Sequence, residues 1–135
     1  MRKLILFTAL VVVLMLVPMP TMAGVSVGVG IALPPPIVVA GPPDVVAMPD
    51  APGVYVAPDV GVDLFFWSGW WWRPWGGHWY RSRYYDRGWG YFRGGVPGFY
   101  RHVNRGWRGN FRSRTWGGHA WNYRRIPHGQ FQHRR

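Results

Sequence analysis

The chain of 135 residues contains no cysteine. Disulfide bonds, thiol nucleophiles and cysteine metal ligands are therefore excluded, and so is anchoring through an acylated cysteine. Acidic side chains are also scarce, because the sequence has five aspartates and no glutamate. Lysine occurs once, at Lys3. The basic residues after Lys3 are arginine and histidine. Because there are no disulfide cross-links, side-chain packing has to stabilise the fold.

Groups that carry catalysis or hold metals are sparse. After residue 60 the carboxylates are Asp63 and Asp86, and acid–base catalysis usually needs a convergent pair. The serines lack a nucleophile motif, and the five histidines form no His-x-x-x-His or His-x-His pair. His128 and His133 are five residues apart in the expected tail, but a structured metal site needs convergent ligands. We therefore expect no catalytic residue, no metal site and no cofactor, so the protein is interpreted as not being an enzyme.

The first 23 residues follow the order of a secretory signal peptide. Arg2 and Lys3 precede an apolar run over 4–17, and small residues stand at Thr21 and Ala23. We expect cleavage after Ala23 and a mature protein in the periplasm, the outer envelope or the medium. The alternative is an uncleaved anchor, but a membrane span needs about 20 apolar residues, which this run does not reach.

The rest of the chain is divided by charge. Residues 24–66 contain four aspartates and no basic residue, whereas residues 67–135 contain 14 arginines and one aspartate. This excess of positive charge favours anionic partners. Eight prolines over 34–58 remove backbone donors and favour an extended path. We expect residues 24–53 to form a disordered, Pro-rich arm that acts as a spacer; a docking ligand for an aromatic groove is the alternative.

Short β-favouring runs alternate with turn residues over 54–96. The runs cover 54–56, 63–67, 70–73, 78–82 and 89–92, and the connections between them contain Pro, Gly, Ser or Asp. Such connections are typical of hairpins. The sequence therefore predicts a mainly β fold, a small antiparallel meander of short strands.

The pattern weakens after Pro97. Residues 99–103 predict one helical turn, and the following residues are rich in Arg, Gly, Asn and His without a sustained period. We expect residues 97–135 to form a poorly ordered basic tail that frays from about His128.

Half of the 28 residues from Phe65 to Phe92 are aromatic. Some of these rings must form the core, since no other residues supply one. Neighbouring strand residues point to opposite faces, so Trp70 and Trp72 share one face and Trp71 lies on the other. A small sheet without covering helices cannot bury both faces. We therefore expect some tryptophans to be exposed to a partner.

Arginines are interleaved with these rings, and arginine both stacks on aromatic faces and binds oxyanions with a planar fork of donors. The expected partner is an anionic glycan or lipid surface, with peripheral membrane contact. The Arg-Gly pairs also suit nucleic acid, but export leaves only extracellular DNA. The candidate binding residues are Arg73, Arg81, Arg83, Arg93, Trp70, Trp71, Trp72 and Trp79.

The segment 63–82, DLFFWSGWWWRPWGGHWYRS, resembles a core found in small, uncharacterised exported proteins of Gram-negative bacteria. The pieces VPGFYR at 96–101 and WNYRRIPH at 121–128 are similar to parts of the same proteins. The resemblance implies the periplasm or outer envelope. It brings no activity and no functional residue.

Three functions are compatible with this sequence. The first is a non-catalytic exported envelope protein whose Arg/Trp surface binds lipopolysaccharide, acidic polysaccharide or lipid. The second is a secreted cationic factor in which the same residues disturb bilayers. The third is a purely structural envelope protein whose arginines only keep an aromatic-rich chain soluble.

Overall fold

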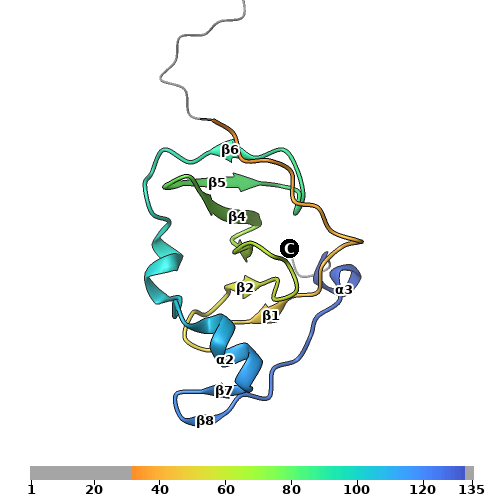
Figure 1. Ribbon diagram of the computed structural model, residues 1–135, viewed down its shortest axis with the longest axis vertical. Coiled ribbons are helices and arrows are strands. Elements are labelled where there is room, and N and C mark those ends of the chain that lie inside the picture. Colours follow the sequence, from red (N-terminus) through yellow and green to blue (C-terminus); the bar gives the residue numbers. More distant parts are fainter. Residues whose placement is uncertain (1–31, 133–135) are drawn as a thin grey trace, which may run out of the picture. The chain divides into compact units, whose positions relative to one another are not determined.

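The computed structural model describes residues 32–132 (Figure 1). The signal peptide, its cleavage site and the first residues of the expected arm lie outside this range. Within it, the chain forms a six-stranded antiparallel sheet whose strands follow sequence order, together with a two-stranded sheet. Short helices occupy the second half of the described range. The predicted mainly β class and the antiparallel meander are confirmed.

Five of the six strands of the large sheet fall largely within the predicted runs. The predicted helical turn over 99–103 is confirmed as η1 (Gly98–His102), whereas the first strand, the second sheet and the helices over 107–113 and 128–132 were not predicted. The meander consists of β1 (Val46–Ala47), β2 (Tyr55–Val56), β3 (Phe65–Trp67), β4 (Trp70–Trp75), β5 (His78–Ser82) and β6 (Gly90–Tyr91). After it come η1 (Gly98–His102), α2 (Trp107–Ser113), β7 (Thr115–Trp116), β8 (His119–Ala120) and α3 (His128–Gln132).

Two-residue turns set the register of the central strands. Ser68 and Gly69 connect β3 to β4, and Gly76 and Gly77 connect β4 to β5, all with φ between 52° and 81°. Two successive residues of positive φ form a type I′ turn, whose twist matches the flanking strands. Pro74, expected in the turn, lies inside β4. Proline has no N–H, and its nitrogen faces β3. The pairing of β3 with β4 ends at Phe65 and Trp72, so Pro74 has no partner there and no ladder hydrogen bond is lost.

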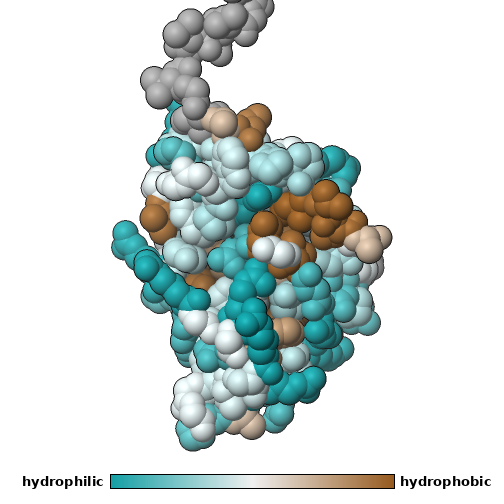
Figure 2. Space-filling view, in the orientation of Figure 1, coloured by the Kyte–Doolittle hydropathy of each residue, from teal (hydrophilic) through white to brown (hydrophobic). Residues whose placement is uncertain are grey.

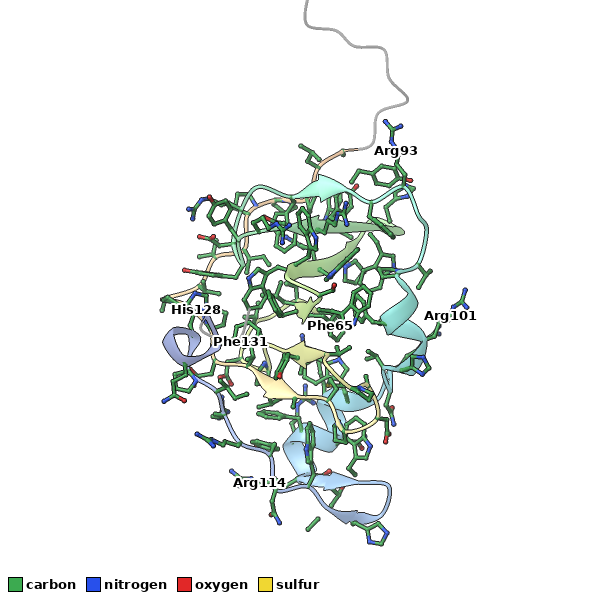
Figure 3. All side chains as sticks on the ribbon, turned by 180° about the vertical axis from the view of Figure 1, so that it is seen from behind. Phe65, Arg93, Arg101, Arg114, His128 and Phe131 are labelled. Atoms are coloured by element: carbon green, nitrogen blue, oxygen red, sulfur yellow. The ribbon has the colours of Figure 1, made fainter. Side chains whose placement is uncertain are left out.

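The first face of the sheet carries Phe65, Trp72 and Trp79, and η1 and α2 cover it. Phe65 is fully buried, and its ring centroid lies 5.8 Å from that of Phe99 in η1 and 6.4 Å from that of Trp107 in α2. The labelled Phe65 lies near the middle of the molecule in Figure 3. This face therefore holds the main aromatic core.

The second face carries Tyr55, Phe66, Trp71, Arg73 and Tyr80. The Tyr80 hydroxyl donates to the carbonyl of Ala32 at 2.7 Å, and the Arg73 guanidinium donates to the carbonyl of Pro35 at 2.7 Å. The segment that precedes β1 therefore lies over this face.

Helix α3 covers the rest of the second face. Phe131 is 1% exposed, and its ring centroid lies 4.4 Å from that of Phe66 and 5.1 Å from that of Tyr55. The structure therefore differs from the expectation that the chain frays from His128. Pro127 precedes the helix and suits a helix start, and Phe131 is the apolar anchor that holds it on the sheet.

The segment 34–51 differs from the expected spacer. Val45 and Ile126 exchange backbone hydrogen bonds of 3.0 and 2.8 Å, which places the second half of the chain against the edge formed by β1. Val46, Met48 and Ala51 are buried in the core. The prolines leave enough apolar residues between them for this segment to pack on the sheet rather than extend away from it.

Two ion pairs and a hydrogen bond to a carboxylate also join the two halves of the chain. Arg125 bonds to Asp59, the Arg108 Nε donates to Asp63 at 3.2 Å, and the indole N–H of Trp116 donates to Asp50 at 2.6 Å. Hydrogen bonding to the Asp59 carboxylate raises the pKa of Arg125. The separation of acidic and basic residues along the sequence thus places complementary partners on segments that dock together.

Because both faces are covered, the expectation of exposed tryptophans is wrong. All ten tryptophans lie in the described range; none is exposed, and four are half-buried. The expectation assumed that the arm and the tail stay off the sheet, whereas both pack on it. In addition, none of the described helices is long and apolar enough to span a membrane.

Candidate functional site

The structure brings together three of the candidate binding residues, Trp70, Arg81 and Arg83. In the register of β4 and β5, Trp72 lies opposite Arg81, and continuing the pairing past Trp71 and Ser82 puts Trp70 opposite Arg83. The Arg83 Cζ lies 3.7 Å from the centroid of the Trp70 ring, and the Arg81 Cζ lies 4.3 Å from it. We name Trp70, Arg81 and Arg83 the Arg–Trp stack.

Both guanidinium groups of the stack are held in place by further contacts. Arg83 donates through Nη1 to the Gly69 carbonyl at 2.8 Å, and the Arg81 Cζ lies 5.6 Å from the Trp72 ring and 5.5 Å from the Phe92 ring. Arg83 is exposed and Arg81 is half-buried. A guanidinium has five N–H donors, so most of the donors of Arg83 remain available to a ligand.

The positive charge of the stack is not balanced within the described residues. The ion pairs found there join Arg87 to Asp86, Arg108 to Asp63 and Arg125 to Asp59. Neither arginine of the stack has a carboxylate partner among those residues. Two like charges held against one ring repel each other, and an oxyanion that contacts both relieves this repulsion.

Trp71, Trp72 and Trp79 do not belong to this surface. Trp71 is 0% exposed on the second face, and Trp72 and Trp79 are buried among the rings of the first face. They are core residues in this structure, so the expectation that they contact a partner is corrected. Only Trp70 among the four candidate tryptophans is accessible enough to touch a ligand.

Arg93 is exposed but separate from the stack. Phe92 donates its backbone N–H to the Trp79 carbonyl, so Arg93 lies level with the start of β5. Arg83 follows the end of β5, roughly 16 Å away at about 3.3 Å per residue. Figure 3 shows the Arg93 side chain pointing away from the molecule. It contributes general positive charge rather than a contact of the stack.

Arg73 is buried on the second face, with 3% of its surface exposed. Its Cζ lies 5.5 Å from the Trp89 ring, and its Nε has no hydrogen-bond partner among the described residues. Burial lowers the pKa of its guanidinium because removal from water disfavours the charged form. Arg73 therefore packs within the sheet, and the burial of its charge opposes folding.

We expect the Arg73→Met variant to be more stable than the parent by about 1 kcal/mol, because methionine fills the site without a buried charge. Urea denaturation measures the change. Arg73→Lys is the matched control and should be less stable than the parent, since an ammonium is more strongly hydrated and lacks the planar face that packs on Trp89. A methionine variant less stable than the parent would show that the cation stabilises the fold.

An apolar cavity of about 210 Å³ lies beside the stack, and the sequence did not indicate it. Val54 lies opposite Trp67 when the pairing of β2 and β3 is continued by one residue, and Trp67 pairs with Trp70. From the two-residue turn at 68–69, the sequence could have predicted that Trp67 and Trp70 share one face. It could not have predicted the cavity, because another wall comes from η1. It is lined by Ala51, Pro52, Val54, Trp67, Gly98, Phe99 and His102.

A larger hollow of about 410 Å³ has a different chemistry. Its lining includes Val38, Val39, Asp44 and Asp59, so its charged groups are carboxylates. Figure 2 shows apolar surface over the segment drawn in orange in Figure 1, where Val38 is 97% exposed. Arg125 pairs with Asp59, and no basic residue of the described range lines the hollow, so its walls provide no positive charge for the anionic partners predicted from the sequence.

The described residues contain no group of three histidine or carboxylate side chains placed to hold a metal ion. Comparison of the chain with protein-family models, with curated proteins and with solved structures finds no match. The resemblance of residues 63–82 to exported Gram-negative proteins stays a prediction.

Proposed function

We propose that this protein is a non-catalytic, exported envelope protein that binds anionic surfaces through the Arg–Trp stack. The observation that carries the proposal is the contact of two guanidinium groups, which have no carboxylate partner among the described residues, against one half-buried indole ring. The other exposed arginines, such as Arg93 and Arg101, add a positive field that attracts the same partners.

Binding is better supported than disruption of bilayers. A membrane-active factor inserts aromatic and aliphatic side chains into the lipid, and here most tryptophans are held inside the fold. Between residues 32 and 132, the large apolar side chains that remain exposed are Leu33, Val38, Tyr84, Tyr91 and Val96. They provide a smaller apolar surface than the composition suggested.

The test replaces the two charges of the stack. The Arg81→Gln/Arg83→Gln variant should bind lipopolysaccharide, anionic vesicles and heparin about tenfold or more weakly at roughly 50 mM salt, because two charge-assisted contacts are lost. Its affinity should also fall less steeply with added salt, since fewer counterions are released on binding. Titration calorimetry at several salt concentrations measures both quantities.

The matched control is Arg101→Gln/Arg112→Gln, which removes two exposed positive charges away from the stack. It should change affinity only slightly. Equal losses in the two variants would mean that net charge, rather than the stack, carries binding. If the parent binds none of the three probes, the purely structural interpretation stands.

A further inference from the structure

The Arg–Trp stack and the small apolar cavity lie along one row of the first face. Following the strand pairing from β2 to β5, the row reads Val54, Trp67, Trp70 and Arg83. Val54 and Trp67 line the cavity at one end, and Arg83 packs on Trp70 at the other. Adjacent strands are about 4.8 Å apart, so the backbone of Arg83 lies roughly 10–14 Å from those of Trp67 and Val54, while its guanidinium group reaches back over Trp70.

The buried ring of Trp72 links the two ends of this row from below. The ring centroid of Trp67 lies 6.2 Å from that of Trp72, and the indole N–H of Trp72 donates to the Trp67 carbonyl at 3.1 Å. The Arg81 Cζ lies over Trp72 as well as Trp70. The floor between the cavity and the charges is therefore aromatic, with no carboxylate on it that would repel an anion.

The cavity suits part of an apolar chain. Its volume of about 210 Å³ is below the roughly 300–1,000 Å³ of pockets that enclose a whole small molecule. Its walls come from the segment before β2, from β3 and from η1, and they are aliphatic or aromatic apart from His102. A few methylene groups would fill it, while the rest of the ligand lies outside.

We propose that the row binds an acylated phosphate lipid. The phosphate contacts Arg81 and Arg83, the linking atoms lie across Trp70, and the first part of one acyl chain enters the cavity beside Trp67. This inference rests on the proposed function and narrows it from anionic surfaces in general to lipids that carry both a phosphate and an apolar chain. A sulfated or carboxylated polysaccharide satisfies the arginines but leaves the cavity empty.

The test compares ligands with one headgroup and chains of different length. Glycerol 3-phosphate, dibutanoyl phosphatidate and dihexanoyl phosphatidate are titrated into the full chain as monomers, with heparin as a polyanion without acyl chains. Each methylene moved from water into an apolar site strengthens binding about fourfold. Affinity should therefore rise tenfold or more from glycerol 3-phosphate to dihexanoyl phosphatidate.

Gly98 offers a way to block the cavity. It lines the cavity, and a side-chain carbon added to it meets no atom within 4 Å. Gly98→Leu should abolish the chain-length preference and leave binding of glycerol 3-phosphate and heparin unchanged. Gly109→Leu is the matched control in α2, where an added carbon is equally free of contacts, and should keep the preference. Thermal melts of both variants report whether the fold is intact.

The outcomes separate the two proposals. Equal affinity for glycerol 3-phosphate and dihexanoyl phosphatidate, with heparin still bound, would overturn the lipid inference and leave the proposed function standing. A chain-length preference that survives in folded Gly98→Leu would also overturn it, because the chain would then bind elsewhere. Failure of the parent to bind any of these probes would contradict the proposed function itself.

Discussion

Replacing Phe131 with alanine is expected to lower the free energy of unfolding by about 3–5 kcal/mol, as for other large aromatic side chains removed from a core. The ring is 1% exposed and packs edge-on against Phe66, Tyr55 and Trp71. Figure 3 shows Phe131 beside the sheet although it lies near the end of the sequence. A tail without a structural role would tolerate the same change at no cost.

Chemical denaturation of the Phe131→Ala variant measures this loss. For a domain of this size it corresponds to a decrease in Tm of about 12 °C or more. Gln130→Ala, an exposed position on the same helix, is the control and should change stability by less than about 0.5 kcal/mol. Equal stabilities of the two variants would mean that α3 does not hold the second face.

The second large effect is expected from Trp71→Ala. Trp71 is fully buried, with its ring centroid 5.2 Å from that of Phe66 and 6.2 Å from that of Tyr85. Its removal should destabilise the protein by about 3–5 kcal/mol. Affinity for lipopolysaccharide, measured at a temperature where the variant is still folded, should stay within about twofold of the parent, because Trp71 lies on the face opposite the stack.

Trp70→Ala is the matched comparison, since it removes the neighbouring ring from the other face. Trp70→Ala should destabilise the protein less than Trp71→Ala, because the Trp70 ring is only half-buried. It should weaken binding at all salt concentrations, because both guanidinium groups lose the ring that holds them. A thermal melt and a binding titration of both variants separate the two roles. A loss of affinity in folded Trp71→Ala, with none in Trp70→Ala, would contradict the assignment of core and surface.

Local sequence was sufficient to predict the strands of the meander from β2 to β6. β-favouring runs mark the strands, and turn-forming residues such as Gly76 and Gly77 mark where they end. These signals act over a few residues and need no partner. The alternation of strand residues also placed Trp70 and Trp71 on opposite faces, as the structure has them.

Local sequence could not decide which ring is core and which is surface, because that depends on what covers each face. Trp71 is buried because the rings of Phe131 and His128 in α3 pack against it. The ring of Phe99 in η1 covers Trp72, whereas Trp70 on the same face stays half-buried. These are contacts between distant residues, as is the bridge between Val45 and Ile126. The sequence by itself determined that the protein is β-rich, basic and aromatic. Only the tertiary structure selected Arg81 and Arg83 as the arginines that share an accessible ring, because long-range packing buries Arg73 and strand geometry separates Arg93.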